Sequence, residues 1–295
     1  MSIATAASHS TRGAFCCKLA SRRGPHAHDD PANIVKHIPR RRFGQNFLAD
    51  PHYASRIVAA IDPRPGETIV EIGPGRGALT DPLIERAGRV VAIEIDRDLA
   101  RQLRDRYPPD RLVLHEGDAL EFDFAGLPDD LRVVGNLPYN ISSPLLFHLM
   151  SFASKLRDVT VMLQREVVDR MTAHPATPDY GRLTVMLQSQ FRVERLFTVP
   201  AGAFRPAPKV ESALARLVPL GAGAPDIADR ELFAKLVRAA FGQRRKTLRN
   251  AVSGIADEPA LRRAGVDPGD RGETLAVADF VCLANRLAGE KSASA

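Results

Sequence analysis

The sequence has few cysteines and no long apolar run. Three of its 295 residues are cysteine (Cys16, Cys17 and Cys282), which does not make a disulfide framework and fits a reducing, cytoplasmic setting. No stretch approaches the roughly 20 consecutive apolar residues that a bilayer-spanning helix needs, so we expect no membrane segment. Histidines such as His115 and His148 do not stand at metal-ligand spacing with acids or cysteines, and we expect no metal.

Acidic residues are missing from two parts of the chain. The first 28 residues contain none and lack the apolar core of a secretory signal. We therefore expect residues 1–36 to form a disordered extension, with an organelle transit peptide as the alternative. Residues 232–256 contain six basic residues and no acid. Such a run attracts polyanions such as nucleic acid, although a solvated face has the same composition.

The chain contains enough apolar material for a sizeable core. With 44% hydrophobic residues, it has room for one large domain and a small one. Strand patterns occur at 67–73, 89–96, 111–118, 131–136 and 158–164. Helical spacing occurs between them, at 77–88, 97–107, 143–152 and 165–173. This alternation predicts an α/β fold, with a parallel sheet and helices on both of its faces.

The pattern changes towards the end of the chain. Two closing strands are expected at 186–199 and 211–220, followed by the hinge-like GAGAP at 221–225. Helical spacing without strands then covers 229–253 and 275–288. These features predict an α/β domain over 37–220 and a small all-α domain over 226–290.

A glycine-rich turn lies between the first expected strand and the first expected helix. The stretch EIGPGRG (71–77) is placed at the carboxyl edge of a parallel sheet, where ligands bind. Glu94 ends the next strand, 21 residues after Gly73, where a carboxylate can accept hydrogen bonds from ribose hydroxyls. A tight turn without a ligand is the alternative, and these two features do not separate NAD from S-adenosylmethionine.

Details of the turn favour S-adenosylmethionine. The spacing is G-x-G-x-G rather than G-x-G-x-x-G, and Pro74 removes a backbone donor that a pyrophosphate-binding turn would use. Asp118, at the end of the third strand, suits the amino group of an adenine. Its alternative is a helix-capping or turn residue.

A second motif, NLPYN (136–140), ends the fourth expected strand at the same sheet edge. The amine of adenine is a poor nucleophile because its lone pair is delocalised into the ring. The Asn136 side-chain oxygen and the Leu137 carbonyl can accept both N–H hydrogens and favour a tetrahedral amine aimed at an electrophile. Pro138 stiffens this backbone, and Tyr139 offers a face on which an extruded base can stack, worth about 1–3 kcal/mol. A plain turn would explain only the Asn and the Pro.

These motifs carry a family resemblance. NLPY resembles the (D/N)-(P/L)-P-Y signature of amino-group methyltransferases that act on nucleic acids. From about Pro39 onward the chain resembles, more narrowly, the bacterial small-subunit ribosomal RNA adenine dimethyltransferases. The matching segments, in order, are RRFGQNFLAD (41–50), EIGPGRGALT (71–80), EIDRDLA (94–100), GDAL (117–120), GNLPYNISSPLL (135–146), VPAGAFRPAPKVESALARL (199–217) and FGQRRKTLRN (241–250). The resemblance implies a Rossmann-like class I S-adenosylmethionine-dependent methyltransferase domain with a small all-α C-terminal domain.

The resemblance also implies roles for individual residues. The cofactor S-adenosylmethionine would be bound by Asn46, Leu48, Glu71, Gly73, Glu94, Asp118 and Asn136. In that family the segment matching 45–48 folds over the cofactor. Glu94 would contact its ribose and Asp118 its adenine, while Gly73 would lie near its methionine part. Glu71 is a second candidate near the methionine end.

Further residues are implied for the RNA side. Phe204, expected on an exposed loop, would stack on the target base opposite Tyr139, and core packing is its alternative. RNA phosphates would be contacted by Arg205, Lys209, Arg244, Arg245, Lys246 and Arg249. We expect Arg244 to Lys246 to share one helical turn, for which a solvated face is the alternative.

The implied activity is dimethylation of two adjacent adenosines in a 3′-terminal hairpin of 16S rRNA in the small ribosomal subunit, by a monomer that takes part in subunit biogenesis. One alternative is a large-subunit rRNA methyltransferase of the macrolide-resistance type, against which FGQRRKTLRN argues. The others are a non-catalytic ribosome assembly factor and, more distantly, an NAD-dependent enzyme.

Overall fold

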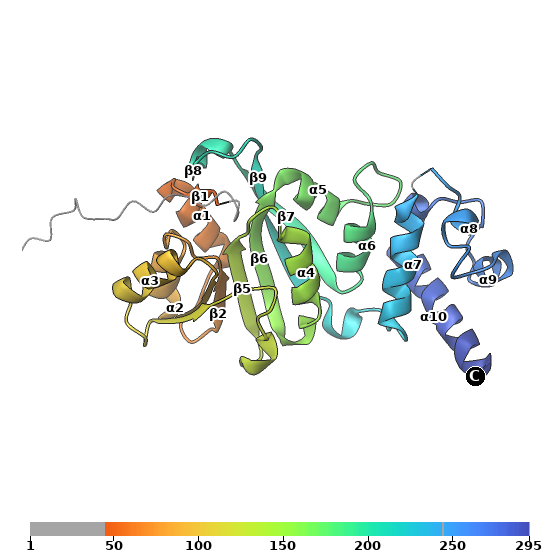
Figure 1. The fold of residues 1–295 in the computed structure, drawn as a ribbon, viewed down its shortest axis with the longest axis horizontal. Helices are drawn as coiled ribbons and strands as arrows, with labels where there is room; N and C mark the ends of the chain where they lie inside the picture. The colour runs from red at the N-terminus through yellow and green to blue at the C-terminus, as the bar shows by residue number, and fades with distance from the viewer. Residues whose placement is uncertain (1–44, 244, 295) are drawn as a thin grey trace, which may run out of the picture. The chain divides into compact units, whose positions relative to one another are not determined.

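The computed structural model describes residues 45–243 and 245–294 (Figure 1). The predictions for residues 1–36 and for Arg244 lie outside these described residues. No helix within the described ranges is both long and apolar enough to cross a bilayer.

A seven-stranded sheet in the order β4-β3-β2-β5-β6-β9-β7 forms the centre of the fold (Figure 1). Its strands are β2 (Ile69–Ile72), β3 (Val90–Glu94), β4 (Leu112–Glu116), β5 (Leu131–Asn136), β6 (Leu156–Gln164), β7 (Phe191–Val199) and β9 (Ser212–Pro219). The strands from β4 to β6 are parallel, as predicted. β9 is antiparallel to both β6 and β7, so the two closing strands make the sheet mixed.

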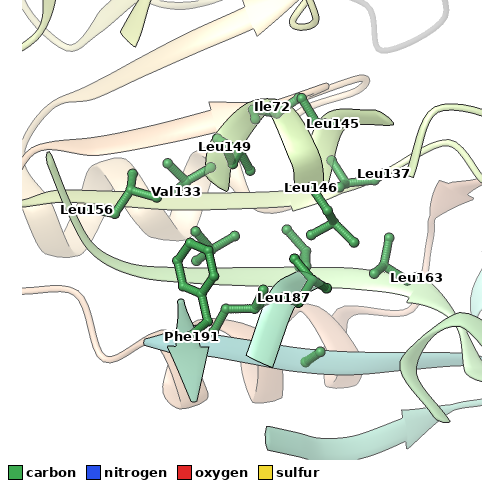
Figure 2. Close-up of a cluster of buried hydrophobic side chains, with 14 of the residues drawn as sticks. Ile72, Val133, Leu137, Leu145, Leu146, Leu149, Leu156, Leu163, Leu187 and Phe191 are labelled. Atoms are coloured by element: carbon green, nitrogen blue, oxygen red, sulfur yellow. The ribbon is translucent and has the colours of Figure 1, made fainter. Parts of the chain in front are cut away.

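Helices cover both faces of the sheet, and each face has its own buried cluster. The helices of this part are α1 (Pro51–Ile61), α2 (Thr80–Ala87), α3 (Arg97–Arg106), α4 (Ser142–Met150), α5 (Arg165–Thr172) and α6 (Arg182–Gln188). Val133 packs with Leu146 of α4 and Leu187 of α6 on one face (Figure 2). The next residue along β5, Val134, packs on the other face with Ile57 of α1 and other side chains, because successive strand residues point to opposite faces.

The prediction of one strand over 186–199 is wrong in its first part, because α6 extends to Gln188 and β7 begins only at Phe191. Local hydrogen bonds explain the helix. The Thr184 hydroxyl accepts from Gly181 N at 3.1 Å, and the Gln188 side chain donates to two carbonyls at the end of α5. In an apolar run as short as this one, periodicity alone does not distinguish a helix from a strand.

The C-terminal part contains α7 (Arg230–Gly242), α8 (Leu248–Ala251), α9 (Glu258–Arg263) and α10 (Val277–Ser294). The short helix α9 was not predicted. The buried cluster of these helices also includes Tyr180 and Met186 from the preceding part. Tyr180 Oη donates to the Leu275 carbonyl at 2.8 Å. The described residues belong to one compact unit, and the domain division between 220 and 226 stays a prediction.

The carboxyl ends of β2 and β5 approach each other closely at Gly135. Gly135 pairs with Ile72 in the sheet. A Cβ atom on Gly135 would lie 2.6 Å from the Ile72 carbonyl oxygen and 3.0 Å from Leu137 Cδ2. Only glycine fits this position without moving one of the two strands, and these strands lead directly into Gly73 and Asn136.

We predict that Gly135→Ala lowers the free energy of unfolding by about 1–3 kcal/mol, because the added methyl group forces two hydrogen-bonded strands apart. Urea unfolding of both proteins measures this change. Gly126→Ala is the matched control, since no atom lies within 4 Å of a Cβ placed there. Equal losses of stability in the two variants would contradict the packing argument.

Candidate active site

An open pocket lies at the carboxyl edge of β2, β3, β4 and β5. Its empty space, including the part open to solvent, is about 1140 Å³. The carboxyl edge is where α/β sheets of this kind bind ligands. The structure brings together nine of the predicted site residues in the pocket lining, namely Asn46, Leu48, Glu71, Gly73, Glu94, Asp118, Asn136, Leu137 and Tyr139.

The glycine-rich turn forms one wall of the pocket. Gly73, Gly75 and Gly77 have φ angles of +67°, +59° and +84°, in the left-handed region that favours glycine. At Gly75 the constraint is also steric, because a Cβ atom would lie 3.0 Å from the Phe47 ring. The turn can therefore bring its backbone close to a ligand.

The outer side of this turn is braced by the end of α3. Tyr107 and Arg106 both hydrogen-bond to the Asp81 carboxylate, and Arg106 also donates to the Arg76 carbonyl at 3.3 Å. Tyr107 Oη would lie 3.0 Å from a Cβ on Gly77. These contacts connect the turn to the end of α3 through residues that do not line the pocket.

Glu94 is a buried carboxylate with acceptor capacity to spare. It is 4% exposed, and its two oxygens accept from Gly75 N at 3.0 Å and Asp96 N at 2.9 Å. Burial raises the pKa of Glu94, while these backbone donors oppose the rise. A carboxylate has about four acceptor positions, so each oxygen can accept a further hydrogen bond, for example from a ribose hydroxyl.

Glu71 is the second buried acid of the pocket. It is 2% exposed and accepts from Thr80 Oγ1 at 2.7 Å. Burial raises the pKa of Glu71 to about 7; the Thr80 hydrogen bond opposes the rise, and the carboxylates of Glu94 and Asp81 add to it. A positive charge placed beside this carboxyl would favour its ionised form.

We predict that Glu71 makes the protein less stable as the pH rises from 4.5 to about 7. The folded state holds the proton more tightly than the unfolded chain, with pKa values of about 7 and 4.5. The stabilising effect of protonation is therefore complete below pH 4.5, is lost as the pH rises to about 7, and stays lost above it. Relative to wild type, Glu71→Gln should gain stability over this window, on the order of 3 kcal/mol.

Urea unfolding of the two proteins at a series of pH values tests this prediction. Glu85→Gln, on the exposed side of α2, is the control and should run parallel to wild type. Parallel curves for wild type and Glu71→Gln would show that the Glu71 proton is not held more tightly in the folded state.

Asp118 and Ile95 follow the carboxyl ends of β4 and β3. Asp118 Oδ1 accepts from Leu120 N at 2.9 Å, so the residue does close a turn, as its alternative interpretation held. Asp118 also lines the pocket. It can close the turn and bind a ligand at once, because Oδ2 has no partner among the described residues.

Ile95 was not predicted as a site residue from the sequence. It is 44% exposed and lines the pocket directly after Glu94, where an apolar side chain can pack against a flat ring.

The Asn136 side chain is held in one orientation by a backbone carbonyl that is far from it in the sequence. Its Nδ2 donates to the Asn46 carbonyl oxygen at 2.9 Å. This bond uses the donor end of the amide and leaves Oδ1 as an acceptor with no partner among the described residues. The neighbouring Leu137 N donates to the Met162 carbonyl at 3.1 Å. Tyr139 is tied by its hydroxyl to Ser212 Oγ at 3.0 Å.

The segment that contains Asn46 covers the pocket. Its β1 strand (Phe47–Leu48) pairs antiparallel with β8 (Phe204–Arg205). Gln45 Nε2 donates to Asp96 Oδ2 at 3.2 Å, and the Arg76 guanidinium lies 4.7 Å from the centre of the Phe47 ring. Gln45, Phe47 and Arg76 were not predicted as site residues. The sequence motif that contains Gln45 and Phe47 was recognised, but it does not reveal that these residues contact Asp96 and Arg76.

The expectation that Phe204 lies on an exposed loop is wrong. Its side chain is 1% exposed and packs in the cluster of Leu48 and Leu214, and it does not line the pocket. Pairing of β8 with β1 explains this, because Phe204 stands opposite Leu48. The core-packing alternative is correct, and a stacking role would require the ring to leave this cluster.

The predicted RNA-binding residues in the described ranges, Arg205, Lys209, Arg245, Lys246 and Arg249, are exposed. Arg249 forms an ion pair with Glu258 at 3.6 Å. The expectation of one helical turn for Arg245 and Lys246 is wrong, because α7 ends at Gly242 and α8 begins at Leu248. A turn closes the connection, with Lys246 N donating to the Gln243 carbonyl.

No group of three or more His, Cys, Asp or Glu side chains within the described ranges is placed to hold a metal ion.

Comparison with known proteins gives consistent similarities. Residues 36–289 match the family model described as ribosomal RNA adenine dimethylase. The chain is 60% identical over 255 residues to a ribosomal RNA small subunit methyltransferase A of Aromatoleum aromaticum, covering 86% of this chain and 96% of the relative. It is 57% identical over 252 residues to the protein of the same name in Thiobacillus denitrificans, covering 85% and 99%.

Two solved structures are similar over most of the chain. A dimethyladenosine transferase from Plasmodium falciparum has a TM-score of 0.73 at 25% identity, covering 83% of this chain and 98% of that one. The 23S rRNA methyltransferase ErmE has a TM-score of 0.62 at 29% identity, covering 82% and 100%. The fold of this chain is therefore similar to those of a dimethyladenosine transferase and a 23S rRNA methyltransferase.

Proposed function

The chain belongs to the ribosomal RNA adenine dimethylase family, and on this basis we propose that it dimethylates two adjacent adenosines in a 3′-terminal hairpin of 16S rRNA within the small ribosomal subunit. It is an S-adenosylmethionine-dependent rRNA adenine dimethyltransferase with the class I methyltransferase fold and a role in small-subunit biogenesis. The hairpin, the two adjacent targets and the 16S rRNA of the small subunit as partner are the proposed part.

The observation that carries the proposal is the orientation of Asn136 in the pocket. Its donor end is occupied by the Asn46 carbonyl, and its oxygen is left to accept. Such an acceptor suits the amino group of adenine, whose lone pair must leave conjugation with the ring before the nitrogen can attack a methyl group. Tyr139 lines the same pocket, and its hydroxyl is hydrogen-bonded to Ser212. Its ring offers a face on which the target adenine can stack.

The pocket fits the cofactor in its donor and acceptor pattern. When bound, S-adenosylmethionine supplies an electrophilic methyl group on a positively charged sulfur. Glu94 keeps acceptor positions for ribose hydroxyls, and Asp118 and Ile95 suit an adenine. The Glu71 carboxyl is buried and hydrogen-bonded by Thr80, and a cationic ligand beside it would supply the missing opposite charge.

The protein's own groups position the amine. Asn136 Oδ1 and the Leu137 carbonyl accept its two N–H hydrogens. The nitrogen would release one proton to solvent water after attack, so no general base is needed before it. After the first transfer the amine keeps a single N–H. Only one of the two acceptors can then be used, and the pocket must hold a bulkier amine for the second transfer.

RNA binding is proposed for Arg205, Lys209, Arg245, Lys246 and Arg249, whose exposed positive charges suit phosphates. Arg244, outside the described residues, stands in the same basic stretch of the sequence. We further propose a cytoplasmic monomer that uses no metal, and a base-stacking role for Phe204 only in a state in which its ring has left the cluster that buries it.

Two other functions are weaker. The similarity to ErmE, a 23S rRNA methyltransferase, is compatible with a large-subunit substrate. The 60% and 57% identities to small-subunit enzymes favour the small subunit. A non-catalytic assembly factor would have no use for an oriented acceptor amide beside a cofactor pocket.

Methyl transfer from labelled S-adenosylmethionine to unmodified small and large subunits, with mass spectrometry of the digested RNA, tests the proposal. Dimethyladenosine is expected at two adjacent positions in the small subunit only. Labelling of the large subunit instead would overturn the small-subunit assignment.

Asn136→Ala should lower the rate of transfer by about 100- to 1000-fold, because an oriented group that stabilises the transition state is removed. Binding of the small subunit should be retained. Gln102→Ala, which removes an exposed amide of α3, is the control and should keep wild-type transfer. Wild-type rates in the Asn136 variant would show that this amide does not position the amine.

A further inference from the structure

Arg182 and Arg238 form a pair of positive charges at the junction between α6 and α7. Arg182 is the first residue of α6 and is partly buried, while Arg238 is exposed on α7. Neither side chain forms an ion pair within the described ranges. Arg165, Arg170 and Arg195 differ in this respect, because each has a carboxylate partner.

α6 packs against α7, and the positive charge of Arg238 acts on Arg182 across this contact. With its amide turned so that its nitrogen donates to the Met150 carbonyl, Gln190, two residues after α6, accepts from Arg230 at the start of α7 at 3.2 Å. Arg182 is eight residues before Gln190 and Arg238 is eight residues after Arg230. The Gln190–Arg230 contact therefore marks one end of the α6–α7 contact, and the pair of Arg182 and Arg238 marks the other.

Arg182 is held in place without being neutralised. Its guanidinium carbon lies 5.2 Å from the centre of the Phe147 ring of α4, and its Nε is buried without a hydrogen-bond partner. Burial lowers the pKa of Arg182, and the positive charge of Arg238 lowers it further. The two terminal nitrogens of this guanidinium are not among the buried atoms and have no hydrogen-bond partner among the described residues. An anionic acceptor can therefore bind Arg182 through these terminal nitrogens.

We propose that Arg182 and Arg238 together bind one phosphate of the RNA backbone, at the junction between the α/β part and the C-terminal helices. A phosphate oxygen accepts from the planar guanidinium of Arg182, which lies against the Phe147 ring, and the exposed Arg238 completes the clamp. This inference rests on the proposed function, which supplies the RNA.

The surrounding charge favours RNA over other anions. Lys235 is exposed one turn before Arg238 on α7, and the connection after this helix carries Arg245 and Lys246. The stretch 232–256 contains no acid. A line of separate positive charges matches the regular spacing of phosphates along a strand, whereas a single small anion would need only the two arginines.

Binding of Arg182→Gln, Arg238→Gln and the double variant to unmodified small subunits, measured across a salt series, tests the proposal. Each single variant should bind about 5- to 20-fold more weakly at low salt and lower the slope of log K against log salt by about 0.7–0.9, the value for one neutralised phosphate. The double variant should lose less than the sum of the two, because both arginines hold the same phosphate. Cofactor binding should not change.

Arg101→Gln is the matched control, since it removes one exposed arginine that is already paired with Asp98 at 3.8 Å. Arg238 is exposed, so its variant tests the proposal even if Arg182→Gln folds poorly. Salt slopes equal to that of Arg101→Gln would overturn the proposal. A loss seen with intact subunits but not with protein-free 16S rRNA would also overturn it, by assigning the arginines to a ribosomal protein.

The same preparations separate this inference from the proposed function. Suppose that the wild-type protein methylates the small subunit and that the variants bind it with the same salt dependence as wild type. The phosphate-binding role of Arg182 and Arg238 is then wrong, while the proposed function stands. If wild-type protein transfers no methyl group to either subunit, the proposed function fails first.

Discussion

The hydrogen bond from Asn136 Nδ2 to the Asn46 carbonyl connects the parts of the molecule that build the pocket. Asn136 ends β5, and Asn46 belongs to the segment that pairs with β8 and contacts the glycine-rich turn. The same bond decides which end of the Asn136 amide can accept. This single bond therefore fixes both the position of the segment around Asn46 and the orientation of the Asn136 amide. The close approach of β2 and β5 at Gly135 sets the position of Asn136 itself.

Around this bond the protein gathers buried carboxylates at a cost to its stability. Glu94 and Asp96 are compensated by backbone donors, but Glu71 has only the Thr80 hydroxyl. Buried acids with too few donors are typical of sites whose ligand completes the charge balance. At the junction between α6 and α7, Arg182 and Arg238 show the opposite case, because neither has a carboxylate partner within the described ranges. The two imbalances have the signs expected for a cationic cofactor and an anionic RNA.

The local features of the fold and site were predictable from the sequence. Strands that end just before Gly73, at Glu94 and at Asn136 follow from hydrophobic periodicity together with the motifs at each strand end. The wrong predictions share a different cause. Phe204 was judged by its neighbours in sequence, two prolines and two basic residues, whereas a strand more than 150 residues away buries it. Residues 182–188 form a helix through hydrogen bonds to Arg170, Met171 and Ala173 that no pattern within the segment reveals. The partners of Asn136 and of Arg182 are likewise set by tertiary packing.

The central claim is that this pocket holds the cofactor with its reactive end at Asn136. A crystal structure of the protein with adenosine and an S-adenosylmethionine analogue that cannot transfer its methyl group tests it most directly. We predict that the ribose hydroxyls of the analogue donate to Glu94, that Asn136 Nδ2 stays on the Asn46 carbonyl, and that the adenosine amine donates to Asn136 Oδ1. An analogue bound without contact to Glu94, or an Asn136 side chain turned away from the amine, would contradict the account.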